Sequence, residues 1–237
     1  MENATMEQGS QNVGRALRVL FIGNSATYVH DLPLTLGRLA TDAGYPMECH
    51  MLVKGGWRLS QHADAVSEWG AQVFAEIAQG YDLVFLQDNG NCITSDELRE
   101  ASMAACRRLA AAVTASGGQI WLYVRPPYGT EHAGRSPFAQ CEEFDRFFGE
   151  IGAEIGAKYA HVNRAFAYAM MHLPYDLWGP DHAHTSERGA YLAICVFFAA
   201  IFGKSSALLG SNDLPPEDAR ALQAVADAIV LNGILPW

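Results

Sequence analysis

The chain has 237 residues, half of them apolar and 18% charged, which predicts one domain with a sizeable core and excludes a disordered chain or a disulfide-stapled miniprotein. Sixteen Lys and Arg residues against 26 Asp and Glu residues give a net charge of −10. Because an acidic chain repels phosphate backbones, nucleic acid is not expected as a partner.

The sequence contains neither a recognisable signal peptide nor a membrane-spanning segment. Residues 1–14 are polar and lack the apolar centre of a signal peptide, so we expect a flexible segment over 1–16, a single domain over 17–237 and a cytoplasmic location. The stretch 190–202 is too short to span a membrane, so no membrane partner is expected. Five cysteines with no CxxC pair are expected to be buried free thiols.

Short β-rich runs alternate with longer helical patterns along the chain. In order, the sequence predicts a strand at 17–22, a helix at 32–43, a strand at 47–53, a helix at 60–79, a strand at 83–86, a helix at 96–115, a strand at 119–124, a helix at 136–158, a strand at 159–163, and helices at 186–202 and 215–231. In the second helix, His62, Asp64 and Glu68 are expected on the solvated face.

The strands are apolar on both faces, as in a parallel sheet covered from both sides. Their alternation with helices predicts an α/β protein, a three-layer α/β/α sandwich of about five parallel strands joined by right-handed crossovers. In such open sheets ligands bind at the carboxyl ends of the strands. The loops there are rich in Gly, Asn and other polar residues, as a site requires; they are 23–27, 54–58, 87–91 and 125–129.

Ser25 is the first candidate for chemistry. It follows a buried strand and a Gly-Asn turn, just before a helix. A serine hydroxyl at that place can serve as a nucleophile, although a helix cap or turn serine fits the same position.

A base for Ser25 is found far along the chain, in the segment 181–186. Asp181 and His184 are three residues apart, a spacing that lets the carboxylate reach Nδ1 and leaves Nε2 for the serine. A capping or surface-loop role is the alternative for each histidine. A metal site of Asp181, His182 and His184, with His172 nearby, lacks a full ligand set, so we expect neither metal nor cofactor.

Donors for an oxyanion follow two other strands. Gly56 offers a backbone N–H that a substrate can approach closely, and Asn89 offers a side-chain amide. With the Ser25 N–H they would hold a tetrahedral oxyanion. Ordinary turn chemistry explains each residue taken alone.

Taken together, these residues form the blocks of a known family, and the sequence resembles the SGNH (GDSL-like) hydrolase superfamily over roughly 17–203. The first block reads Gly23-Asn24-Ser25 where the family usually has Gly-Asp-Ser, the second falls on Gly55-Gly56, the third on Gln87-Asp88-Asn89-Gly90, and the last is Asp181-x-x-His184, followed by Gly189 and Tyr191. The third block usually reads Gly-x-Asn-Asp. Only its Asn matches here, so Asn91 or Gln87 could replace Asn89 as the donor.

The resemblance is strongest to a bacterial branch with Gly-Asn-Ser openings, through the segment 55–62 and Leu86-Gln87. It implies a flavodoxin-like sandwich and a serine esterase that hydrolyses short-chain esters, above all acetyl esters on carbohydrate. Ser25, His184 and Asp181 would form the triad, and Ser25, Gly56 and Asn89 the oxyanion hole. Other members act as lipases or thioesterases, which are alternatives for this chain.

Side chains beside these loops are candidates for binding a small-molecule or glycan ester. Tyr28, Trp57 and Trp178 could stack on a sugar ring or simply pack at loop edges, and Arg58 and Arg125 could bind a carboxylate or a sugar hydroxyl. Arg125 could equally hold a loop through carbonyls. The loops contain no long apolar stretch to wrap an acyl chain, which favours a short acyl group.

A nonenzymatic ligand-binding domain of the same fold class is the competing hypothesis, since this frame can bind phosphate or flavin after the first strand. The loop 23–27 contains no Lys or Arg, which argues against phosphate.

Overall fold

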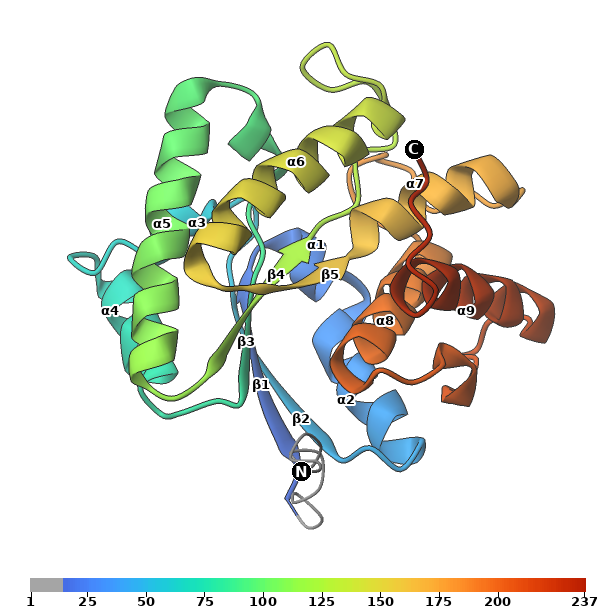
Figure 1. Cartoon of the computed structure of the whole chain (residues 1–237), viewed down its shortest axis with the longest axis horizontal. Helices are drawn as coiled ribbons and strands as arrows, with labels where there is room; N and C mark the ends of the chain where they lie inside the picture. The colour runs from blue at the N-terminus through green and yellow to red at the C-terminus, as the bar shows by residue number, and fades with distance from the viewer. Residues whose placement is uncertain (1–14) are drawn as a thin grey trace, which may run out of the picture.

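The computed structural model describes residues 15–237, so nearly all of the predicted flexible segment 1–16 lies outside the described residues. Its sheet has five parallel strands in the order β2-β1-β3-β4-β5 (Figure 1). They are β1 Leu17–Gly23, β2 Met47–Val53, β3 Leu83–Leu86, β4 Gln119–Val124 and β5 Lys158–His161. This is the strand order of flavodoxin-like folds, and the predicted fold class is confirmed.

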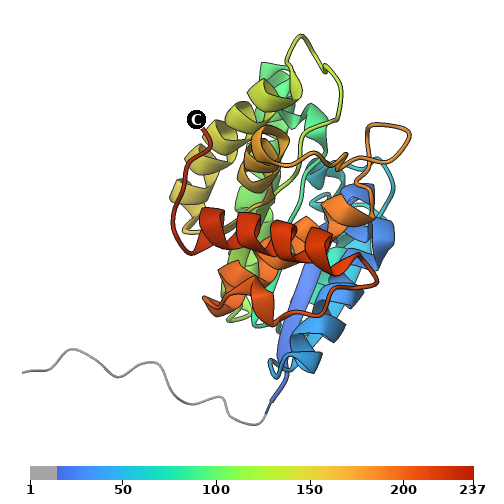
Figure 2. The same cartoon turned by 90° about the vertical axis from the view of Figure 1, so that its right-hand side faces the viewer.

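Helices cover both faces of the sheet, giving three layers (Figures 1 and 2). The helices are α1 Ser25–Tyr28, α2 Leu32–Asp42, α3 Leu59–His62, α4 Glu68–Ile77, α5 Asp96–Ala115, α6 Pro137–Ile155, α7 Val162–His172, α8 Glu187–Phe202 and α9 Pro216–Val230, with 3-10 turns η1 Val29–Asp31, η2 Gly90–Ile93 and η3 Ser206–Leu208. Helices α3 to α6 pack on one face, and α2, α7, α8 and α9 on the other. Among residues 15–237, no helix combines the length and the apolar character that crossing a membrane requires.

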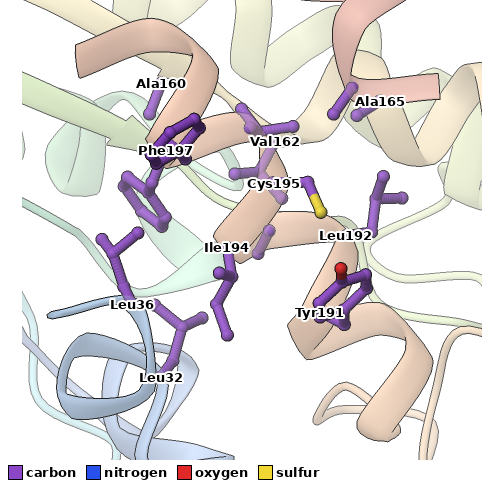
Figure 3. Close-up of a cluster of buried hydrophobic side chains, with 14 of the residues drawn as sticks. Leu32, Leu36, Ala160, Val162, Ala165, Tyr191, Leu192, Ile194, Cys195 and Phe197 are labelled. Atoms are coloured by element: carbon purple, nitrogen blue, oxygen red, sulfur yellow. The ribbon is translucent and has the colours of Figure 1, made fainter. Parts of the chain in front are cut away.

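Two apolar cores separate these layers, because successive side chains of a strand point to opposite faces. In β1, Val19 and Phe21 belong to the core under α8, whereas Leu20 and Ile22 belong to the core under α5. Helix α8 is apolar around most of its circumference, since it lies between the sheet and α9, and Figure 3 shows its side chains facing those of α2 and α7. All five cysteines are free; four are buried, and Cys49 is partly buried.

The helix predicted over 60–79 is two helices, because a turn at 63–67 separates α3 from α4. Asp64 Oδ1 accepts the Val66 N–H at 3.2 Å, and Ser67 Oγ caps α4 by accepting the Gly70 N–H at 3.0 Å. Gly70 lies so close to the Asp64 backbone that a Cβ would collide with it. Both helices contribute side chains to the same core, and Val66, although 96% exposed, continues the apolar periodicity across the break.

Helix α7 is not among the helices predicted from the sequence. The chain passes from β5 into α7 between His161 and Val162 without a loop, and no turn residue marks the boundary. The predicted fifth strand therefore runs to residue 163, two residues beyond the end of β5. Helix α6 ends earlier than predicted, at Ile155, because Gly156 adopts a left-handed conformation with φ 66° and caps it.

Replacing Phe197 by Ala should lower the free energy of unfolding by about 3–5 kcal/mol. Its fully buried ring packs edge-on against Phe21, Phe85 and Tyr123, with centroid distances of 5.4, 5.1 and 4.8 Å, so truncation leaves a cavity between α8 and the sheet. The measurement is urea denaturation of both proteins, with Val66→Ala as a control because Val66 is 96% exposed. Equal losses in the two variants would contradict this account of the core.

Candidate active site

The turn after β1 presents Ser25 as the first residue of α1. Asn24 caps this short helix, and its Oδ1 accepts the Ala26 N–H at 3.1 Å. Asn24 is buried, whereas Ser25 is partly exposed. Within the described part of the chain, the Ser25 N–H donates to no protein acceptor, which leaves it available to a ligand.

Gln87, at the end of β3, holds this turn in place. Its Oε1 accepts the Asn24 N–H at 2.8 Å and the Thr27 hydroxyl at 2.9 Å, and its Nε2 donates to the Asp88 carbonyl. A Cβ on Gly23 would lie 2.5 Å from Gln87 Oε1, so this close approach requires glycine. Since the Gln87 amide is buried and engaged at both ends, it supports the turn, and the alternative of Gln87 as an oxyanion donor is not favoured.

The loop after β2 lies against the Ser25 turn. Asn24 Nδ2 donates to the Trp57 carbonyl at 2.7 Å, and the Lys54 N–H donates to the Gly23 carbonyl at 3.2 Å. Between these contacts Gly56 is exposed with φ 72°, a conformation that glycine adopts without strain. The Gly56 N–H donates to no other residue of the described range.

Asp88 and Asn89 connect β3 to the Gly56 loop. The fully buried Asp88 carboxylate accepts the Leu59 N–H at 2.8 Å, the Asn89 N–H at 2.7 Å and the Ser102 hydroxyl. Burial raises the pKa of Asp88, and these three donors oppose that rise. Asn89 Nδ2 donates to the Gly56 carbonyl at 3.0 Å, so the structure brings together the two predicted oxyanion residues Gly56 and Asn89.

Asn91 is the remaining candidate donor of the third block. Its N–H donates to Asn89 Oδ1 at 3.0 Å, and its own Oδ1 contacts His132 Nε2 at 2.8 Å. It therefore orients the Asn89 side chain and faces the loop after β4, whereas Asn89 itself faces Gly56.

The loop before α8 carries the predicted carboxylate–imidazole pair. His184 Nδ1 lies 2.6 Å from Asp181 Oδ2, and Asp181 Oδ1 accepts the N–H groups of Ala183 and His184, each at 3.0 Å. The backbone and ring N–H groups of His184, with the Ala183 N–H, hold the pKa of Asp181 well below its usual range. Asp181 thus stays ionised and fixes the imidazole so that Nε2 is left for another partner.

Contacts between loops connect the segment that carries this pair with the segment that follows the nucleophile turn. His30, which follows α1, binds the Thr185 carbonyl through Nε2 at 2.8 Å. The loop after β4 supports the other side, since the Gly129 N–H donates to the His182 carbonyl at 2.7 Å and Trp178 Nε1 donates to the Pro127 carbonyl at 2.9 Å. Loops that are distant in sequence therefore meet at the carboxyl edge of the sheet, and direct pairing of Ser25 with His184 stays a prediction.

The predicted substrate-binding side chains differ in exposure. Tyr28 is 36% exposed and Arg58 is also exposed, while Trp57 and Trp178 are half-buried. Arg125 is only 4% exposed; its Nε donates to the Pro126 carbonyl at 2.9 Å, and its guanidinium lies over the Tyr128 ring. Arg125 thus shows the loop-holding contacts that were one of its two predicted roles.

The prediction for His62 was wrong. It was expected on a solvated helix face, yet it is fully buried and accepts the Trp69 Nε1–H through Nδ1 at 3.0 Å. Burial lowers its pKa to about 4. The spacing of Leu59, His62 and Ala63 at i, i+3 and i+4 places His62 on the buried face of α3, a signal that the prediction left unused. The hydrogen bond from Trp69 comes from beyond the turn at 63–67.

The metal hypothesis can be compared with the geometry of the same loop. Across residues 15–237, no three His, Cys, Asp or Glu side chains are grouped closely enough to hold an ion. The carboxylate of Asp181 is instead occupied by His184 and by two backbone N–H groups.

Comparison with known proteins adds independent information. No protein-family model and no curated protein matches the sequence. Among solved structures, a protein from Slackia heliotrinireducens assigned to the SGNH hydrolases is similar, with 26% identity and a TM-score of 0.68 over 79% of this chain and 100% of that one. The chain has the SGNH hydrolase fold. The resemblance predicted from the sequence is confirmed.

Two further solved structures resemble the chain in fold. A DUF4886 family protein from Bacteroides uniformis has 17% identity and a TM-score of 0.74 over 93% of this chain and 97% of its own. Axe2, an acetyl-xylooligosaccharide esterase from Geobacillus stearothermophilus, has 16% identity and a TM-score of 0.63 over 85% and 100%. At these identities the two structures show the shared fold.

The buried His62 should make stability pH-dependent in a defined window. The unfolded chain binds a proton on this side chain near pH 6.5, whereas the folded protein binds it only near pH 4. The free energy of unfolding should therefore fall as the pH drops from about 6.5 to 4, by at most ~3 kcal/mol.

The measurement is the melting temperature of the wild type and of His62→Asn between pH 7 and pH 4. The Asn side chain can still accept from Trp69 but does not titrate, so its curve should be flatter in that window. Parallel curves for the two proteins would contradict the buried, neutral state of His62.

Proposed function

We propose that this protein is a serine esterase that removes short acyl groups, above all acetyl, from carbohydrate esters. The observation that carries the proposal is the Asp181–His184 pair, with Nδ1 2.6 Å from the carboxylate, on a loop bound to the nucleophile turn through His30 and Thr185. An imidazole oriented by a carboxylate beside a partly exposed serine is the arrangement of a catalytic triad.

The first step would form an acyl-enzyme. His184 Nε2 takes the Ser25 hydroxyl proton as Oγ bonds to the ester carbonyl carbon, and the carbonyl oxygen becomes an oxyanion. When the tetrahedral intermediate collapses, the bond to the alcohol oxygen breaks and His184 returns its proton to the leaving alkoxide. Asp181 stabilises the charged imidazolium throughout and keeps Nδ1 as the protonated nitrogen.

The oxyanion would be held by the Ser25 N–H, the Gly56 N–H and the Asn89 amide. Both backbone groups lack protein acceptors in the described chain, and Asn89 uses one of its two amide hydrogens on the Gly56 carbonyl, leaving the other for the substrate. Donors fixed before the substrate arrives stabilise developing charge without reorganisation, and each is typically worth ~3 kcal/mol.

The second step releases the acid. A water molecule gives a proton to His184 Nε2 and attacks the acyl carbon, and collapse of the second oxyanion breaks the bond to Ser25 Oγ. The proton on His184 then returns to Oγ, which restores the free enzyme.

Carbohydrate esters with short acyl groups fit the rim of the site best. Tyr28 and Arg58 are exposed beside the Ser25 and Gly56 loops and can contact sugar hydroxyls. Axe2, whose fold is similar, is an acetyl-xylooligosaccharide esterase. Its likeness supports acetylated glycans as the first substrates to test, ahead of lipids and thioesters.

Hydrolysis of an aryl acetate by Ser25→Ala and by His184→Asn should be at least about 10³-fold slower than by the wild type, because each change removes the activated nucleophile. His182→Asn is the matched control, since His182 is exposed, lies two residues from His184 and has φ 53°, which Asn tolerates. Chelator should leave the wild-type rate unchanged.

Three results would contradict the proposal. Activity that survives in Ser25→Ala would exclude the serine mechanism. If His182→Asn lost as much activity as His184→Asn, the assignment of His184 as the general base would be contradicted. A loss with chelator would favour metal chemistry.

A further inference from the structure

Four side chains on the β2 side of the site form a compact cluster that none of the steps above uses. The ammonium of Lys54 lies 4.3 Å from the centroid of the Trp57 ring and 4.2 Å from that of Trp69. The rings of Trp57 and Trp69 are 6.1 Å apart, and His62 touches both, at 5.4 and 6.1 Å. We call Lys54, Trp57, His62 and Trp69 the lysine clamp.

The clamp joins three separate segments: the loop after β2, helix α3 and helix α4. An indole face carries negative potential, so the two indole rings, inclined at 72° to each other, both attract the same ammonium group. Lys54 has no carboxylate partner among the described residues, and the rings take the place of one.

His62 makes the clamp rigid without adding charge. Its Nδ1 accepts the Trp69 Nε1–H at 3.0 Å, so in the neutral ring Nε2 carries the proton. The ring is fully buried and its pKa lies near 4. At neutral pH the imidazole therefore stays uncharged beside the ammonium of Lys54, and it fixes the orientation of the Trp69 indole.

The clamp is continuous in sequence with the Gly55-Gly56 turn. Lys54 and Trp57 flank the two glycines, and the Trp57 N–H donates to the Lys54 carbonyl at 3.2 Å, which closes the turn. The same two residues bind the nucleophile turn: Lys54 N–H donates to Gly23, and Trp57 accepts from Asn24 at 2.7 Å. These are backbone hydrogen bonds, so the Lys54 and Trp57 side chains extend from the same backbone segment that carries the Gly56 N–H and contacts the Ser25 turn.

A glycine pair needs such support. Gly55 and Gly56 are exposed. A Cβ on Gly55 would meet only the Tyr28 hydroxyl, at 3.0 Å, and nothing lies within 4 Å of where a Gly56 Cβ would be, so Gly56 has no side-chain packing of its own. Glycine also loses more conformational freedom on ordering than any other residue. Oxyanion donors must nevertheless be held within roughly 0.5 Å of the productive geometry.

We propose that Lys54 is a positioning residue for ester hydrolysis: its ammonium, bound by both the Trp57 and the Trp69 ring, holds the Gly56 N–H at the oxyanion position. This inference rests on the proposed function. It predicts that removing the charge affects the rate of the chemical step, because the donor matters most in the tetrahedral state. A cluster that only packs the loop would change stability and leave that rate alone.

The test compares kcat and KM for an aryl acetate in the full-length protein. Lys54→Met keeps the aliphatic part of the side chain and removes the charge. It should lower kcat about 10- to 100-fold, which does not exceed the typical loss from deleting one oxyanion donor. KM should change less than about threefold. Lys54→Arg keeps a cation that stacks on indoles and should restore kcat to within about threefold of the wild type. Lys158→Met is the matched control, since the Lys158 ammonium lies over Trp121, 5.5 Å from its centroid, on β5.

A second measurement separates positioning from folding. Phenylboronic acid forms a tetrahedral adduct with an activated serine, so its inhibition constant should rise in Lys54→Met by a factor similar to the fall in kcat. Trp69→Leu should produce the same pair of effects, and the double variant should lose little more than either single one, because both changes open the same clamp.

A wild-type kcat in a folded Lys54→Met would overturn the inference, as would an unchanged inhibition constant. If Lys54→Met fails to fold, a Lys54→Arg variant that folds but has the low kcat would likewise overturn it. Failure of the proposed function has a different signature, since Ser25→Ala would then be active whatever the result at Lys54.

Discussion

The site depends on how the backbone groups at the carboxyl edge of the sheet find hydrogen-bond partners. Where parallel strands end, the ladder stops, and buried N–H and C=O groups must be satisfied by side chains. Gln87 accepts the Asn24 N–H in the turn before Ser25, and Asp88 accepts the N–H groups of Leu59 and Asn89. Asn24 and Asn89 connect these turns to the loop of Gly56. A few buried amide and carboxylate groups therefore determine where three loops lie.

The two halves of the proposed triad are supported differently. The Ser25 turn is held by buried hydrogen bonds to the Gln87 side chain, which lies close against Gly23. The Asp181–His184 loop is more exposed and is held by its own turn hydrogen bonds and by His30. Rigid donors beside a more accessible base suit a reaction in which the substrate must enter and a water molecule must follow.

Much of this architecture could be predicted from the sequence. Four of the five strands lie within one residue of their predicted ends, because each is an apolar run between clear turn residues, and the layer arrangement followed from their alternation with helices. The boundary of α7 could not be found, since β5 passes into it directly. The break between α3 and α4 was hidden because both helices contribute side chains to the same core.

The candidate site was predictable as a set of residue types but not as a set of contacts. Ser25, Gly56, Asn89, Asp181 and His184 were identified by their place after strands and by family resemblance. The burial of His62 follows from its spacing with Leu59 and Ala63 on one helix face, which the prediction did not use. The supporting role of Gln87 depends on a partner 63 residues away, and no local pattern encodes such a pair. The same holds for Trp69, whose contact with Lys54 exists only after α4 folds back on the loop.

The central claim is that the converging loops make Ser25, and no other hydroxyl, a nucleophile. Treating the protein with a fluorophosphonate and mapping the adduct by mass spectrometry tests this directly, because only an activated serine displaces fluoride from phosphorus. We predict one adduct per chain, on the tryptic peptide 19–38, whose only serine is Ser25, with loss of esterase activity in proportion to labelling. An adduct on another residue, or full activity after complete labelling of Ser25, would contradict the claim.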